Sequence, residues 1–126
     1  MPAVAAIAFA CVTAIVVAFE VALALGAPWG AYAMGGARLG RFSAAMRASA
    51  IGQAVVLAFL AVIVLADAGL GLPTVSESFR WLIWLAVAFS AVGVVLNAIT
   101  RSAAERRLWL PVALVMLVSS LVVALS

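Results

Sequence analysis

The chain has 126 residues, of which 70% are hydrophobic and only 9% carry a charged side chain. Soluble domains average about 25% charged residues, so this composition excludes an ordinary soluble domain and indicates a protein solvated by lipid. The net charge of +3 comes from arginine alone. The arginines are spread over several segments and form no dense basic stripe, which argues against nucleic acid as a partner.

The sequence also lacks the residues on which much enzyme chemistry depends. It contains no histidine, the commonest general base and metal ligand, and no CxxC pair. Its one cysteine, Cys11, lies in an apolar run and is expected to be a small packing residue. We therefore expect no enzymatic activity, no metal and no cofactor. The polar groups that an enzyme could still use are Glu20, Tyr32, Asn97, Arg101 and Glu105.

Four long apolar segments follow one another, over about residues 3–25, 42–66, 75–99 and 103–125. Each is long enough to cross a hydrocarbon core of ~30 Å at ~1.5 Å per residue. Without water, a segment must satisfy its own backbone hydrogen bonds, so each is predicted to be a helix. Short connections make neighbouring helices antiparallel. The sequence thus predicts one all-α domain over residues 1–126, an up-down-up-down transmembrane four-helix bundle.

Turn and capping residues mark the ends of these segments. Gly26 is expected to end the first helix, and Gly69 separates the second from the third. Ser102 and Glu105 have the spacing of a capping box at the start of the fourth. Pro111 lies about two turns further on and predicts a kink or a short interfacial turn.

The arginines are distributed unevenly between the two sides of the predicted bundle. One side carries only Arg80, and the other carries six: Arg38, Arg41, Arg47, Arg101, Arg106 and Arg107. Loops rich in arginine stay in the cytoplasm. The sequence therefore predicts a multi-pass protein of the bacterial cytoplasmic (inner) membrane with both termini outside.

Four tryptophans fall near the predicted membrane boundaries. Trp81 and Trp84 lie at the outer boundary, and Trp29 and Trp109 lie at the inner one. Tryptophan is enriched at both headgroup layers, so these four residues are predicted to anchor the helices at the interfaces.

Few polar side chains interrupt the apolar segments, and such groups are functional candidates by default. The candidates here are Glu20, Arg47, Gln53, Asn97 and Arg101. Helical spacing gathers them and their neighbours into three stripes: Ala6, Thr13 and Glu20; Ser49 and Gln53; and Ser90, Gly93, Asn97 and Arg101. If all three stripes face inward, the bundle holds a polar patch near the predicted cytoplasmic side.

Two interpretations of this patch stay open. In the first, Glu20 and Arg47 form an ion pair between helices, Gln53 and Asn97 add interhelical hydrogen bonds, and the protein is a structural or accessory membrane component. In the second, Arg47 extends to the headgroups and Glu20 titrates in a small proton- or cation-coupled transporter. The sequence shows no ring of aromatic residues around Glu20.

Small residues recur at intervals of four in the first two segments. They are Ala6, Ala10, Ala14, Ala18 and Ala22, followed by Ala44, Ala48 and Gly52. Such spacing permits close approach of helices. We expect it to serve packing inside the bundle; the alternative is association with another copy or with a membrane protein partner.

Two segments carry a resemblance to known proteins. Residues 26–30 read GAPWG and are followed by MGG at 34–36, while residues 97–102 lead on to Glu105, Arg106, Trp109 and Pro111. Together they resemble a group of small uncharacterised four-helix integral membrane proteins that is common in actinobacteria. Ala31 departs from that pattern, in which an acidic residue is expected. The resemblance implies the fold and the membrane location and carries no activity with it.

Overall fold

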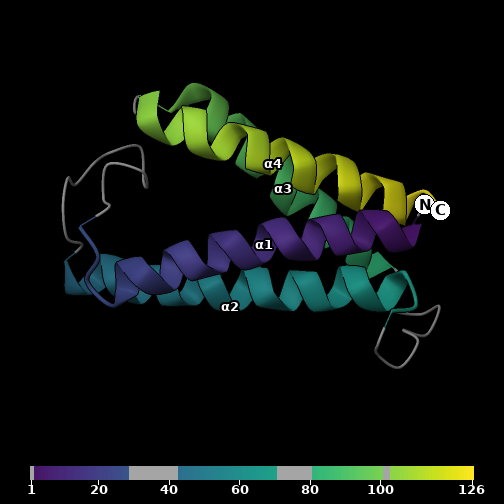
Figure 1. Ribbon diagram of the computed structural model, residues 1–126, viewed down its shortest axis with the longest axis horizontal. Helices are drawn as coiled ribbons and strands as arrows, with labels where there is room; N and C mark the ends of the chain where they lie inside the picture. Colours follow the sequence, from purple (N-terminus) through teal and green to yellow (C-terminus); the bar gives the residue numbers. More distant parts are fainter. Residues whose placement is uncertain (1, 29–42, 71–80, 101–102) are drawn as a thin grey trace.

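The computed structural model describes residues 2–28, 43–70, 81–100 and 103–126, and these form four helices (Figure 1). Helix α1 spans Pro2–Ala24, α2 spans Ala44–Asp67, α3 spans Ile83–Ile99 and α4 spans Ala103–Ala124. This arrangement confirms the predicted all-α four-helix bundle. The predicted start of the third helix, near residue 75, lies outside the described residues.

Helix length and composition mark the chain as a membrane protein. The helices α1, α2 and α4 have 23, 24 and 22 residues and are apolar enough to cross a membrane, whereas α3 has 17 and is shorter. Large apolar side chains such as Val55, Phe59 and Val118 are exposed on the outside of the bundle. Lipid is the solvent that tolerates such a surface.

Two glycines end helices as predicted. Gly26 has φ 101, its N–H donates to the Leu23 carbonyl at 3.1 Å, and the next N–H, of Ala27, donates to the Ala22 carbonyl at 2.9 Å. Gly69 has φ 78 and ends α2 with the same pair of bonds. A left-handed residue turns the chain back so that the last carbonyls find donors, and glycine adopts that conformation without steric cost.

Polar contacts set the other helix ends. The Ser43 hydroxyl accepts from the Met46 N–H at 3.4 Å and caps the start of α2. Between α3 and α4, the Thr100 hydroxyl donates to Glu105 Oε2 at 3.2 Å, and Arg106 Nη1 donates to the Thr100 carbonyl at 3.0 Å. These two bonds join the end of α3 to the start of α4. The predicted capping role of Ser102 lies outside the described residues.

Pro111 does not interrupt α4. The helix runs from Ala103 to Ala124 with Pro111 inside it, so the predicted alternative of a separate interfacial turn is wrong. A proline within a helix removes one backbone hydrogen bond, and α4 continues on both sides of that position.

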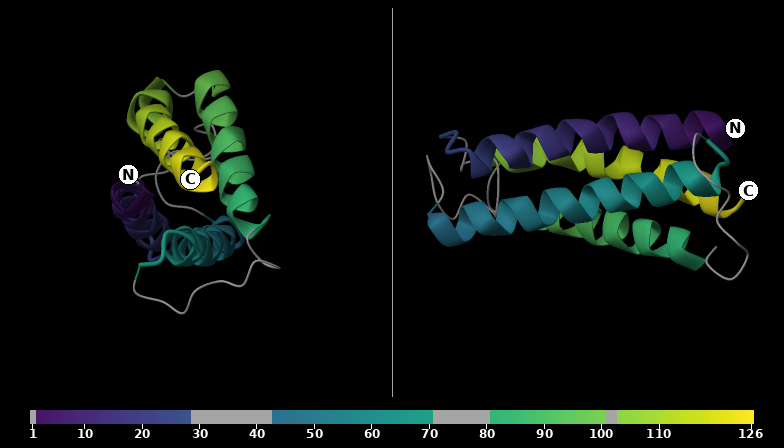
Figure 2. Two further views of the ribbon diagram at one scale, coloured as in Figure 1. Left: turned by 90° about the vertical axis from the view of Figure 1, so that its right-hand side faces the viewer. Right: turned by 90° about the horizontal axis from the view of Figure 1, so that it is seen from below.

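The four helices form two hairpins. Helix α1 packs along α2, α3 packs along α4, and the hairpins meet chiefly through α1 and α4, whereas α2 and α3 have much less contact. Both chain ends lie at one end of the bundle, where the hairpins are close, and the hairpins diverge toward the other end (Figure 1). Figure 2 shows the four helices from the end and from below. We call the half with the chain ends the terminal half and the other the open half.

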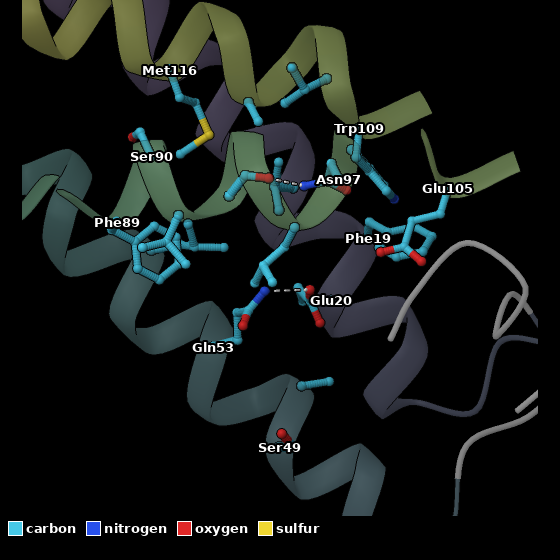
Figure 3. A pocket seen from close by; sticks show the side chains of 18 residues that line it. Phe19, Glu20, Ser49, Gln53, Phe89, Ser90, Asn97, Glu105, Trp109 and Met116 are labelled. Atoms are coloured by element: carbon cyan, nitrogen blue, oxygen red, sulfur yellow. Dashed lines mark hydrogen bonds between the residues drawn. The ribbon is translucent and has the colours of Figure 1, made fainter. Parts of the chain in front are cut away.

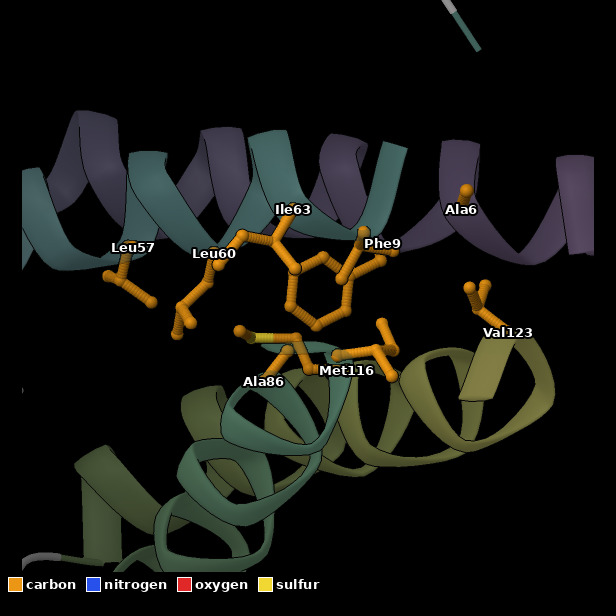
Figure 4. Close-up of a cluster of buried hydrophobic side chains, with 10 residues drawn as sticks. Ala6, Phe9, Leu57, Leu60, Ile63, Ala86, Met116 and Val123 are labelled. Atoms are coloured by element: carbon orange, nitrogen blue, oxygen red, sulfur yellow. The ribbon is translucent and has the colours of Figure 1, made fainter. Parts of the chain in front are cut away.

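The two halves have different cores. In the terminal half, ten buried residues from all four helices form one apolar cluster (Figure 4): Ala6, Phe9, Leu57, Leu60, Ile63, Val64, Ile83, Ala86, Met116 and Val123. In the open half, the buried cluster consists of Leu23, Ala24 and Ala50. These three belong to α1 and α2 alone, so the second hairpin does not take part in the core there.

Most of the small-residue series faces outward. Ala6 is buried, but five other members are exposed: Ala14, Ala18, Ala44, Ala48 and Gly52. A Cβ added at Gly52 would meet no atom within 4 Å. The expectation that this series packs inside the bundle is therefore wrong for α2. Cys11, expected to be a packing residue, is also exposed.

Candidate functional site

A cavity of about 350 Å³ lies in the open half, lined by side chains from all four helices (Figure 3). The stripes that sequence analysis had expected to face inward meet there. The polar lining consists of Glu20 from α1, Ser49 and Gln53 from α2, Ser90 and Asn97 from α3, and Glu105 from α4. Arg101, the remaining member of the expected stripe on α3, lies outside the described residues, as does Tyr32.

Glu20 is held in the cavity by an amide. Gln53 Nε2 donates to Glu20 Oε1 at 3.1 Å, which joins α1 to α2 (Figure 3). The Glu20 side chain is half-buried, and Gln53 is exposed. A neutral amide orients the carboxylate without cancelling its charge.

Arg47 has a different partner from the one that was expected. Its Nε donates to the Ala24 carbonyl at 2.6 Å, and it does not line the cavity. The last carbonyls of a helix lack partners within the helix and form the negative end of its dipole, so a guanidinium is favoured there. The expected ion pair between Arg47 and Glu20 is therefore wrong for the residues that the structure describes.

Helix geometry explains why only one of the two α2 side chains reaches Glu20. Arg47 and Gln53 are six residues apart, which is about 240° around a helix. The two side chains therefore leave α2 in different directions. Gln53 points to the cavity, and Arg47 points to the end of α1.

The polar side chains of α3 are bonded to their own helix. Asn97 Nδ2 donates to the Gly93 carbonyl at 2.7 Å, and the Ser90 hydroxyl donates to the Ala86 carbonyl at 2.8 Å. These are bonds to the residue four positions earlier, a common alternative for short polar side chains. The predicted interhelical bond of Asn97 is therefore not made among the described residues.

Three aromatic side chains line the cavity that contains Glu20, which the sequence did not predict. The rings of Phe19 and Trp109 meet edge to face, with centroids 4.7 Å apart and planes at 63°, and both residues line the cavity together with Phe89. The three come from α1, α4 and α3, so no stretch of sequence shows them together. Trp109 was predicted to be an interface anchor, but in the structure it lines the cavity.

The other predicted anchors fall elsewhere. Trp81 and Trp84 lie at the start of α3 and are exposed, as an interface anchor requires. Trp29 lies outside the described residues. The four tryptophans were predicted to share one role, and the structure separates Trp109 from Trp81 and Trp84.

The polar stripe of α1 continues past the cavity. Thr13 lies one turn before Val16, which lines the cavity, and is buried in the terminal half. Its hydroxyl has no hydrogen-bond partner among the described residues. A buried hydroxyl without a partner is costly, so Thr13 leaves an unsatisfied polar group in the buried part of the terminal half.

The described part of the cavity lining carries charge of one sign. Glu20 and Glu105 are the charged residues in its described lining, and Glu105 is already in contact with Thr100. The described residues hold no group of three potential metal ligands. A carboxylate with aromatic and aliphatic neighbours suits a cation that has an apolar part.

Comparison with known proteins adds no second source of evidence. No family model, no curated protein and no solved structure matches the chain. The resemblance to the actinobacterial group stays a prediction.

Proposed function

We propose that the protein is a small transporter that binds a cation at Glu20 and couples its movement to a proton or to a second cation. The observation that carries the proposal is the cavity of the open half, in which Glu20 is oriented by Gln53 while Arg47 is bound elsewhere. A carboxylate placed in this way is an acceptor for a cation. Ionisable groups inside membrane segments commonly mark ion pathways.

The proposal also specifies how the four helices are oriented in the membrane. Four passes through the bacterial cytoplasmic membrane put both termini outside and the six arginines inside. The position of both chain ends at one end of the bundle supports an even number of passes (Figure 1). The open half, which contains Glu20, then lies on the cytoplasmic side of the membrane.

A purely structural role would require a bond that joins α1 to α2. The structure has such a bond that does not involve Glu20. Arg47 already joins α2 to the end of α1 through the Ala24 carbonyl. An interhelical hydrogen bond such as the one from Gln53 is worth only about 0.6 kcal/mol on average. Stability is therefore a weak reason for placing a carboxylate at this position.

The test is ion movement by the purified protein in vesicles that contain a pH-sensitive dye. An outward gradient of butyltrimethylammonium should drive proton movement in the wild type, and Glu20→Gln should abolish it. Asp67→Asn is the matched control, because Asp67 is the carboxylate at the opposite end of α2 and does not line this cavity. Flux that survives in Glu20→Gln, or that is equal in empty vesicles, contradicts the proposal.

A second candidate is a structural or accessory component of a membrane complex. The observation that favours it is the outward-facing series Ala44, Ala48 and Gly52 on α2, since small residues let a second helix approach closely. Replacing Gly52 by leucine should then release a co-purifying partner or a second copy. Unchanged particle size and composition for this variant would remove the candidate.

A further inference from the structure

The cavity has a side opening between α2 and α3, the two adjacent helices with little mutual contact. On α3, Val92 and Leu96 line the cavity although 57% and 58% of their surfaces are exposed. On α2, Ser49 and Gln53 also line the cavity and are exposed. Residues that belong to the cavity wall and to the outer surface at the same time form the rim of an opening.

On the proposed placement in the membrane, the opening lies within the hydrocarbon core. Val92 is seven residues before the end of α3 at Ile99, which corresponds to about 10 Å along the helix. The neighbouring outer surface is apolar, since Val95 and Ile99 are also exposed. A molecule dissolved in the membrane can therefore reach the cavity without passing through the arginine-rich end.

The side chains that line the cavity are complementary to an amphiphilic cation. Its charged described residues are carboxylates, and its wall near the opening is apolar and aromatic, with Phe89, Val92 and Leu96 from α3. A cation is attracted by the carboxylate of Glu20 and by the faces of aromatic rings. The volume of about 350 Å³ lies within the range of small-molecule sites.

We propose that the cavity takes up single-chain amphiphilic ammonium ions from the membrane through the opening between α2 and α3. The ammonium group lies at Glu20 and Gln53, and the alkyl chain lies against Phe89, Val92 and Leu96. This inference rests on the proposed function in that it uses Glu20 as the cation site. It adds the class of substrate and the route of entry.

The opening provides a matched pair of variants. Val92 and Val95 lie on the same helix and have the same exposed fraction, 57%, but Val95 is not part of the cavity lining. Val92→Phe should narrow the opening, and Val95→Phe adds the same bulk to the outer surface. Both variants should retain the helical circular dichroism and the melting temperature of the parent.

Binding is followed by the fluorescence of Trp109, the tryptophan that lines the cavity. Trp29, Trp81 and Trp84 are first replaced by phenylalanine, which leaves Trp109 as the single tryptophan of the chain. The probes are tetramethylammonium and two trimethylammonium ions with butyl and octyl chains, each chain ending in bromine, which quenches tryptophan on contact. Tetramethylammonium carries no bromine, so its affinity is measured from its ability to displace the brominated butyl ion and restore the fluorescence.

The expected result has two parts. Affinity measured from water should rise about fourfold for each buried methylene group, so the octyl ion binds far more tightly than the butyl ion. In Val92→Phe, the octyl ion should quench Trp109 about tenfold more slowly than in the parent. In Val95→Phe, the rate of quenching should be unchanged. Equal rates in the two variants overturn the lateral route.

The outcomes separate this inference from the function on which it rests. If tetramethylammonium binds as tightly as the octyl ion and Glu20→Gln abolishes binding, the cation site stands and the amphiphilic substrate is overturned. If Glu20→Gln binds every probe as the parent does, the cation site falls as well, and the inference falls with it.

Discussion

The terminal half and the open half are built from the same four helices but are stabilised in different ways. In the terminal half, ten buried apolar residues from all four helices pack together. In the open half, three buried residues from α1 and α2 do so, and the remaining contacts between helices include polar and aromatic ones. Lipid is as apolar as a leucine side chain, so only close packing and polar bonds hold helices together in a membrane. The cavity lies in the half whose buried apolar cluster comes from one hairpin instead of two.

The largest difference between the halves should appear when the core of the terminal half is truncated. Phe9 is completely buried there, and Phe9→Ala should lower the free energy of unfolding by about 3 kcal/mol. The low end of the usual range applies because lipid replaces water as the outer solvent. Phe59→Ala is the control, since Phe59 is 55% exposed on α2. Unfolding in mixed detergent micelles measures both, and equal losses would contradict the comparison.

A smaller loss is expected when the bond between α1 and α2 in the open half is removed. Arg47→Ala leaves the Ala24 carbonyl without its charged donor and should cost about 1.5 kcal/mol in the same unfolding assay. Arg47→Lys keeps a cation near the end of α1 and should lose less. A lysine variant as unstable as the alanine variant would show that the fork geometry of arginine, and not its charge, is what matters.

The smallest effect is expected for the bond inside the cavity. The variants Glu20→Gln and Gln53→Leu and the double variant form a cycle whose coupling energy should be about 0.6 kcal/mol. Gln53 is exposed and the bond is 3.1 Å long, so the carboxylate has little influence on stability. A coupling energy comparable with the loss for Phe9→Ala would make Glu20 a structural residue and would weaken the proposed function.

Local signals in the sequence were sufficient for the fold. Hydrophobic segments of membrane length predicted the number and antiparallel order of the helices, and Gly26 and Gly69 end helices where their backbone freedom is needed. These features depend on residues close together in the chain. The direction in which α2 presents its side chains depends on its rotation against α1, which the sequence does not specify.

For the site, the sequence predicted which polar residues would take part, but it did not predict how each helix is rotated about its axis. The sequence suggested an ion pair between Glu20 and Arg47, but the helix directs Gln53 to Glu20 and leaves Arg47 with a backbone carbonyl. Asn97 was assigned to a neighbouring helix, although a bond four residues back was available to it. Trp109 and Phe89 are far from Glu20 in sequence, and only the packing of α3 and α4 places them in the same cavity lining.

The polar bonds at the open ends of the hairpins have a consequence for the order of assembly. Arg47 bonds to the end of α1 across 23 residues of chain, and Glu105 and Arg106 bond to Thr100 at the end of α3 across 5 and 6 residues. Contacts between near neighbours in the chain form fastest, and the entropy lost on loop closure grows with loop length. We therefore expect the α3–α4 hairpin to form first, the α1–α2 hairpin next, and the contact between the hairpins through α1 and α4 last. Phe9 belongs to a buried cluster with residues of both hairpins, so Phe9→Ala should speed the separation of the two hairpins and also weaken the packing of α1 on α2.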